Sequence, residues 1–247
     1  MKFAFDRNAQ SAAPFPHLRI NEILNRGDAD RILLWLKVAA PWKLVVADFY
    51  EQLEFSLLDS ALPPELKYLI SNDSIEAIAA QLERAFGVGS QLQLVEASAH
   101  KLTRGQTIRI HNDYLEGQES HRLLIQLNEG WEEHQGGLLM LFGSDAPESL
   151  RNILLPIHGS GFAFEISPRS FHAVSSINPT RRTNAAHRNR NGTSSFSLAQ
   201  GVEADSRSSA CSVRVSRHPG FFLQPGVACK LNGSRTGVRL AADRANR

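Results

Sequence analysis

The sequence predicts an α+β protein that is mainly β, with helices first and a β-barrel or sandwich after them. Up to about residue 90, apolar residues recur at helical spacing. From about residue 91 to 180, short β-like runs are separated by Gly, Asn, Asp and Pro. Many short strands spaced in this way are typical of an all-β barrel or sandwich rather than of βαβ units.

Three helices are expected in the first ninety residues. The first spans residues 28–40, where Asp28 or Asp30 offers an N-terminal cap. A second helix opens at Pro63-Pro64, because proline is favoured at the first helical position, and a third spans residues 74–86. The expected β-strands lie at residues 43–46, 92–101, 107–111, 122–127, 137–142, 151–156, 160–166 and 172–177.

Length and composition narrow the class of protein. The 247 residues, 42% of them hydrophobic, suffice for one large globular domain. No apolar run approaches the roughly 18 residues needed to span a bilayer, and the N-terminus lacks the apolar region of a signal peptide. Cys211 and Cys229 are too few for a disulfide framework or a thiolate zinc site. We therefore expect a cytoplasmic protein that is not membrane-bound.

The charge balance changes abruptly near Arg182. Residues 1–182 contain 17 Lys/Arg and 22 Asp/Glu, whereas residues 183–247 contain 10 Lys/Arg and 3 Asp/Glu. Such a change marks a boundary. It predicts three regions, namely an N-terminal helical support region (1–90), a β core (91–182) and an atypical basic tail (183–247).

The tail is rich in Ser, Arg, Asn and Gly and has no clean periodicity. Disorder is the favoured interpretation of residues 183–247, over a folded module. A reading-frame change would explain the segment, and so would a genuine basic extension that binds an acidic partner. Basic motifs interleaved with aromatic residues are missing, so the sequence does not favour nucleic acid as a partner.

The motif that carries chemistry is His111-Asn112-Asp113. A His and a carboxylate two residues apart at a strand end point to the same side, because side chains alternate along a strand. With a second His, they make the two-His-one-carboxylate triad that leaves three positions of an octahedral iron(II) open. His-x-Asp alone is weak evidence, but His172 follows a turn and precedes an apolar strand, 59 positions after Asp113. That length of chain allows several strands to return to the same end of a barrel.

The order of these elements resembles the prolyl 4-hydroxylase-like branch of the 2-oxoglutarate/iron(II)-dependent oxygenases. The resemblance covers roughly residues 95–182, and its matching runs are His111–Asp113, Arg122–Trp131, Gln135–Phe142, Pro156, Gly161–Phe164 and Ser170–Val174. It implies a double-stranded β-helix (jelly roll) core in which His111, Asp113 and His172 hold Fe(2+). It also implies 2-oxoglutarate as co-substrate, O2, and ascorbate as reductant.

The resemblance further implies a basic residue about ten positions after the second His, which binds the distal carboxylate of 2-oxoglutarate. Arg182 lies at that spacing, and Arg181 is the adjacent alternative. Arg122, at a strand start, is a further candidate, although a surface role is as reasonable there. Immediately after Arg182 the pattern departs from the family, because Thr183–Gly192 contains no large apolar residue and is a poor core strand.

The activity that the resemblance implies is hydroxylation of an unactivated C–H bond, with release of succinate and CO2. A prolyl residue in a protein, a peptide, or an amino-acid-like metabolite all fit as substrate. Two alternatives stay open. One is a cupin-like metal-binding barrel without oxygenase activity, and the other is a catalytically impaired barrel that acts as a binding module. The sequence does not indicate the oligomeric state.

Overall fold

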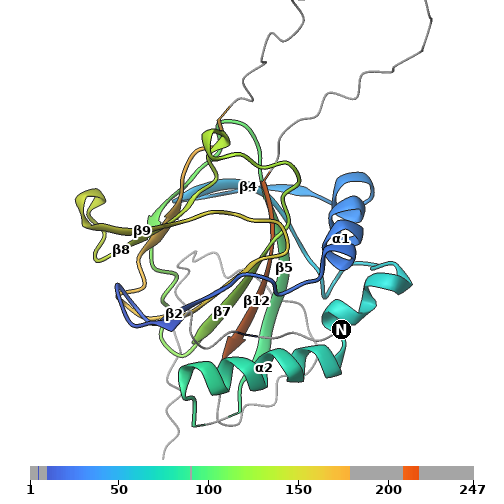
Figure 1. Ribbon diagram of the computed structural model, residues 1–247, viewed down its shortest axis with the longest axis horizontal. Coiled ribbons are helices and arrows are strands. Elements are labelled where there is room, and N and C mark those ends of the chain that lie inside the picture. The colour runs from blue at the N-terminus through green and yellow to red at the C-terminus, as the bar shows by residue number, and fades with distance from the viewer. Residues whose placement is uncertain (1–4, 6–9, 90, 179–207, 217–247) are drawn as a thin grey trace, which may run out of the picture.

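The structure, a computed structural model, is a rolled antiparallel sheet with two helices against one side (Figure 1). It describes residues 5, 10–89, 91–178 and 208–216. Within these residues a twelve-stranded sheet runs in the order β1-β2-β10-β7-β12-β5-β4-β6-β11-β8-β9, with β3 paired to β4. The strands are β1 (Gln10–Ser11), β2 (His17–Ile20), β3 (Lys43–Ala47), β4 (Tyr50–Ser56), β5 (Gln93–Leu102), β6 (Ile108–His111), β7 (His121–Gln126), β8 (Leu139–Phe142), β9 (Leu150–Leu154), β10 (Gly161–Glu165), β11 (His172–Val174) and β12 (Ser208–Ser216).

The roll has two parts that enclose a small apolar interior. One part holds β2, β10, β7, β12, β5 and β4, and the other holds β6, β11, β8 and β9. They join where Tyr50 of β4 pairs with Ile108 of β6. Side chains alternate across the first part, so Leu123 and Ile125 pack outward in one core cluster while Phe162 and Phe164 belong to the other. This is the double-stranded β-helix that the sequence predicts.

Helices α1 (Arg26–Val38) and α2 (Asn72–Phe86) cover the outer face of the first part (Figure 1). The expected cap of the first helix was wrong, because the oxygen of the Asn25 side chain accepts from the Asp28 backbone N–H at 3.0 Å. Asp28 instead lies in the first turn, where a carboxylate favours the positive end of the helix dipole. Neither helix of the described residues is long and apolar enough to cross a membrane.

The other two predicted helices are present, but one of them is a 3-10 helix. The Pro63-Pro64 segment forms a 3-10 helix, η2 (Pro64–Ile70), rather than an α-helix. Helix α2 begins after Ser71 and ends at Gly87, whose φ of 65° closes the helix in the left-handed region. Two further short 3-10 helices are η3 (Glu133–Gln135) and η4 (Pro147–Ser149).

Two regions contain secondary structure that differs from what the sequence predicted. The first ninety residues supply strands as well as helices, since β2 pairs with β10 and β4 pairs with β5. In the segment expected to be an irregular tail, β12 lies between β5 and β7 and is hydrogen-bonded to both. The edges of β5 and β7 are therefore paired by a strand from this segment. The rest of 183–247, with Arg181 and Arg182, lies outside the described residues.

A glycine turn fixes the end of β11 against the chain that leads into β8. Gly136 has a φ of 72° and forms an isolated bridge with Ile177. A Cβ at Gly136 would lie 2.0 Å from the carbonyl oxygen of Ser176, a separation that real Cβ atoms do not show. The backbone therefore approaches Gly136 so closely that this position needs a residue without a side chain.

Gly136→Ala is predicted to lower the free energy of unfolding by about 3 kcal/mol, because the methyl group meets backbone and the φ is left-handed. Gly130→Ala is the matched control, since Gly130 also has a positive φ but its Cβ would meet no atom within 4 Å. The control should cost about 1 kcal/mol. Urea denaturation of both variants measures the difference, and equal losses would contradict the steric explanation.

Candidate metal centre

Two histidines from strands far apart in sequence lie side by side. His111 is the last residue of β6 and His172 the first of β11, and the two are direct register partners in an antiparallel pair. Their ring centroids are 4.2 Å apart. Phe49 stacks on the outer side of His111 at 4.2 Å, and Phe164 meets His172 edge-on at 5.0 Å. The sheet register, flanked by aromatic rings, therefore sets the positions of both imidazoles.

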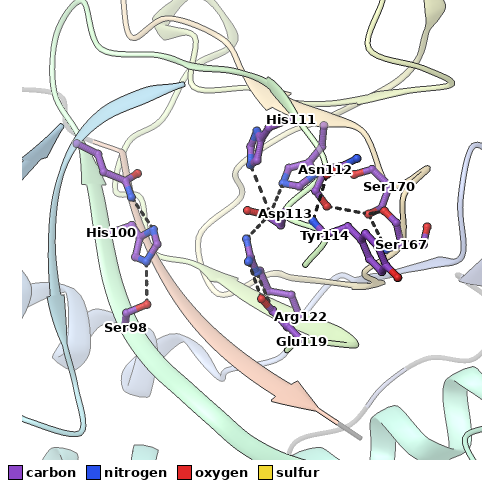
Figure 2. Close-up of polar contacts among 12 residues, drawn as sticks. Ser98, His100, His111, Asn112, Asp113, Tyr114, Glu119, Arg122, Ser167 and Ser170 are labelled. Carbon is purple, nitrogen blue, oxygen red and sulfur yellow. Dashed lines mark hydrogen bonds and ion pairs between the residues drawn. The ribbon is translucent and has the colours of Figure 1, made fainter. Parts of the chain in front are cut away.

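Asp113 reaches the same point by a different route from the predicted one. It lies beyond the end of β6 with a φ of 55°, so a left-handed turn rather than strand alternation brings its carboxylate beside His111. The turn is held from both sides. Asn112 donates from its side-chain amide to the carbonyl of Pro168 at 3.2 Å, and the buried Ser170 hydroxyl lies 3.1 Å from the carbonyl of Asn112 (Figure 2).

Both imidazoles turn their Nε2 atoms toward the centre of the site. Nδ1 of His111 lies 2.8 Å from the carbonyl oxygen of Arg109, and Nδ1 of His172 lies 2.9 Å from that of Ser170. A carbonyl oxygen only accepts, so each Nδ1 carries a proton and Nε2 is the nitrogen of each ring that is left to coordinate a metal. Burial also lowers the pKa of His172, which favours the neutral ligand form.

A carboxylate oxygen completes the group. Oδ2 of Asp113 lies 3.4 Å from Nε2 of His111 and 3.1 Å from Nε2 of His172. Burial alone would raise the pKa of Asp113, but the Arg122 charge and the contacts with both histidines outweigh it and hold that pKa well below its usual range. The carboxylate is therefore ionised.

The three ligand atoms fit a divalent metal. They lie within 4.8 Å of one another, and no other group of this kind is found among the described residues. Metal bonds of about 2.1 Å place neighbouring octahedral ligands about 3.0 Å apart. The observed separations of 3.1 and 3.4 Å from the Asp113 oxygen to the two imidazole nitrogens are close to that edge. Three electron-pair donors facing one another are stabilised by a cation placed between them.

A buried arginine supports the carboxylate. Arg122 donates from Nη1 to Oδ2 of Asp113 at 2.5 Å. Its Nε and Nη2 donate to the two carboxylate oxygens of Glu119, at 3.0 and 2.8 Å. The opposite charges outweigh the effect of burial and raise the pKa of Arg122, so the guanidinium stays charged. Figure 2 shows Arg122 between the two carboxylates.

A cavity of about 560 Å³ is lined by His111 and Asp113, and His172 contacts both of these residues. The far wall of the cavity comes from β4 and β5, which contribute Tyr50, Gln52 and His100. The Gln52 amide donates to Nδ1 of His100 at 3.0 Å, and Nε2 of His100 lies 2.8 Å from the Ser98 hydroxyl (Figure 2). The amide oxygen of Gln52 is buried and has no hydrogen-bond partner in the described part of the chain.

The structure brings together His111, Asp113 and His172 and places Arg122 next to them. Among the described lysines and arginines, Arg122 is the one that lines the cavity. The arginine pair 181–182 lies outside the described residues. Sequence reasoning missed Glu119, although its opposite charge three positions before Arg122 was a usable signal. Gln52 and His100 were also missed, because no short-range pattern links two strands so far apart.

Known proteins share this core. Residues 97–186 match the family model described as the 2OG-Fe(II) oxygenase superfamily. The prolyl 3-hydroxylase OGFOD1 of Xenopus laevis is 35% identical over 86 residues, which are 34% of this chain and 17% of that protein. The chain thus matches less than a fifth of the length of this curated relative.

Two solved structures show the same fold at low sequence identity. A prolyl-4-hydroxylase of Pseudomonas putida has a TM-score of 0.56 and 14% identity, covering 82% of this chain and 93% of that one. A prolyl hydroxylase of Trichoplax adhaerens, in complex with a peptide fragment of the hypoxia inducible factor oxygen degradation domain, has a TM-score of 0.55 and 11% identity, covering 81% and 83%. The segment that matches the 2OG-Fe(II) oxygenase superfamily thus contains His111, Asp113 and His172, and the chain is similar to members of that superfamily over this segment.

Proposed function

We propose that this chain is an iron(II)- and 2-oxoglutarate-dependent dioxygenase that hydroxylates an unactivated C–H bond and releases succinate and CO2. The observation that carries the proposal is the convergence of His111, Asp113 and His172, the first two of which line a cavity large enough for a co-substrate and a substrate group. A structural metal site would be closed by a further protein ligand. Here the described residues offer three ligands from one direction.

Within this proposal the chain supplies two neutral nitrogens and one anionic oxygen to the metal. Iron(II), when bound with 2-oxoglutarate and O2, supplies the oxidising power for C–H hydroxylation, and ascorbate keeps the iron reduced. The protein's own residues bind the metal and orient the groups around it. The aromatic rings of Phe49 and Phe164 exclude water from the outer sides of the two imidazoles. Because the proposed ligand set includes the Asp113 carboxylate, hydroxylation is the outcome we propose.

The distal carboxylate of 2-oxoglutarate is proposed to bind Arg182, with Arg181 and Arg122 as the alternatives. A guanidinium suits this role because its planar fork matches a carboxylate. Support for Arg182 comes from its spacing after His172 in the sequence.

For the substrate we propose a prolyl residue of a peptide or protein, or a related amino acid. The names of the similar proteins support this choice, since they include a prolyl 3-hydroxylase, a prolyl-4-hydroxylase and a prolyl hydroxylase bound to a peptide. The cavity suits such a ligand. Phe49 and Tyr50 offer aromatic surface to an aliphatic ring.

Turnover of 2-oxoglutarate without added substrate tests the proposed activity. The wild-type chain, incubated with iron(II), ascorbate and 2-oxoglutarate, is expected to form succinate above background. His172→Ala should reduce succinate to background, because it removes one of three ligands. Mass spectrometry of succinate is the measurement. Background succinate in both proteins would remove the oxygenase proposal.

Asp113→Asn is predicted to weaken Mn(II) binding by at least about 100-fold, more than the 10–100-fold typical of changes outside the ligand set. The amide has the shape of the carboxylate but lacks its charge. Asp145→Asn, at an exposed position away from the cavity, is the control and should bind as the wild type does. Titration followed by electron paramagnetic resonance measures free Mn(II). Unchanged binding by Asp113→Asn would place the metal elsewhere.

Arg182→Gln is predicted to raise the KM for 2-oxoglutarate by about 10-fold or more, because a charge-assisted pair with the distal carboxylate is lost. Arg181→Gln, one position away, should change it by less than about 3-fold. Metal affinity should be unchanged in both variants. A larger effect from Arg181→Gln would exchange the two roles, and no effect from either would exclude this pair as the anchor.

A further inference from the structure

All three nitrogens of the Arg122 guanidinium donate hydrogen bonds to carboxylates of the protein, which indicates a role other than binding a co-substrate. Its Nε and Nη2 form a two-point fork with Glu119, at 3.0 and 2.8 Å, and Nη1 donates to Asp113. The side chains of Arg122 and Glu119 are each 9% exposed. A co-substrate carboxylate could take the fork only by breaking a buried bidentate ion pair, which is strongly unfavourable.

Asp113 needs such support because its own backbone does not fix it. It lies outside β6 in the left-handed region, which costs a non-glycine residue free energy and persists only where neighbours enforce it. A carboxylate also rotates about its last torsion, so either oxygen can face the imidazoles. The N–H of Arg122 selects Oδ2, the oxygen that lies 3.1 and 3.4 Å from the two imidazole nitrogens.

Glu119 completes the support in two respects. It fixes the plane of the guanidinium through two hydrogen bonds, on an arginine whose backbone is held in β7 between β10 and β12. It also balances the arginine charge. A lone buried cation beside Asp113 would oppose a divalent metal, whereas a neutral Arg122–Glu119 pair leaves the negative charge of Asp113 available to it.

We propose that Arg122 and Glu119 act as a positioning pair for the metal ligand Asp113, and that Arg122 does not anchor 2-oxoglutarate. The inference rests on the proposed metal site. It assigns to Arg122 an effect on metal affinity and coordination geometry, through Asp113, with little effect on the affinity for the co-substrate. It assigns to Glu119, which touches none of the three ligand atoms in the contacts described, a measurable effect on the same quantities.

Binding of Co(II), followed by its visible absorption, tests the proposal without turnover. Arg122→Gln is expected to weaken Co(II) binding by about 10–100-fold and to change the absorption bands, as removal of outer support does in metal sites. Glu119→Gln should also weaken it, by leaving the arginine charge unbalanced. The double variant should be no weaker than Arg122→Gln alone, because the two residues act as one unit. Arg151→Gln, an exposed arginine on β9, is the control.

The conservative variant and the co-substrate separate positioning from anchoring. Arg122→Lys keeps the charge but not the fork, so it should restore less than half of the lost metal affinity. 2-Oxoglutarate titrated into the cobalt-loaded proteins should bind Arg122→Gln within about 2-fold of the wild type. Weakened 2-oxoglutarate binding with normal Co(II) affinity would overturn the proposal and make Arg122 the anchor.

The folding of each variant and the activity of the wild-type protein are measured in separate experiments. Circular dichroism and the thermal midpoint report whether each variant folds, and if Arg122→Gln does not, Glu119→Gln and Arg122→Lys decide the matter. If Glu119→Gln then bound Co(II) as tightly as the wild type does, the proposed positioning pair would be refuted. A wild-type protein that binds Co(II) but forms no succinate would refute the proposed activity and leave the positioning pair standing.

Discussion

The register between β6 and β11 is the constraint on which the site depends. Because His111 and His172 are direct partners across an antiparallel pair, their imidazoles emerge on the same face, and a shift by one residue would send one of them to the other side. The pairing of β11 with β8 on its other edge and the Gly136 bridge with Ile177 prevent that shift. The jelly roll therefore determines the geometry of the site mainly through one pair of register partners, His111 and His172.

Charge is balanced locally around that pair. Asp113 is an anion in a largely buried site, and an anion in such a place is retained only when a cation or hydrogen-bond donors compensate for lost hydration. Arg122 compensates before any metal binds, and Glu119 compensates Arg122 in turn. These two ion pairs keep the Asp113 carboxylate ionised and ordered before the metal binds. Metal binding therefore does not have to supply the free energy needed to order this ligand.

That His111, Asp113 and His172 lie together could be expected from the sequence, because a His-x-Asp at a strand end and a later His beside a turn are local features that also match the family resemblance. The route by which Asp113 converges was not predictable in this way, since a φ of 55° depends on the contacts of Asn112 with the 168–170 turn. Strand β12 was missed for a related reason. Its pairing with β5 and β7 is non-local, and the polar segment before it shows no periodicity.

The division of the cavity between two parts of the chain bears on specificity. All three ligand residues, with Arg122 and Glu119, fall in the segment 97–186 that matches the superfamily. By contrast, Tyr50 and Gln52 of β4, on the opposite wall, lie outside it. In the proposed function, the shared segment provides the reaction and the earlier β4 region selects what is oxidised. Two enzymes with the same triad would then differ in substrate through the residues at these β4 positions, without any change in the ligands.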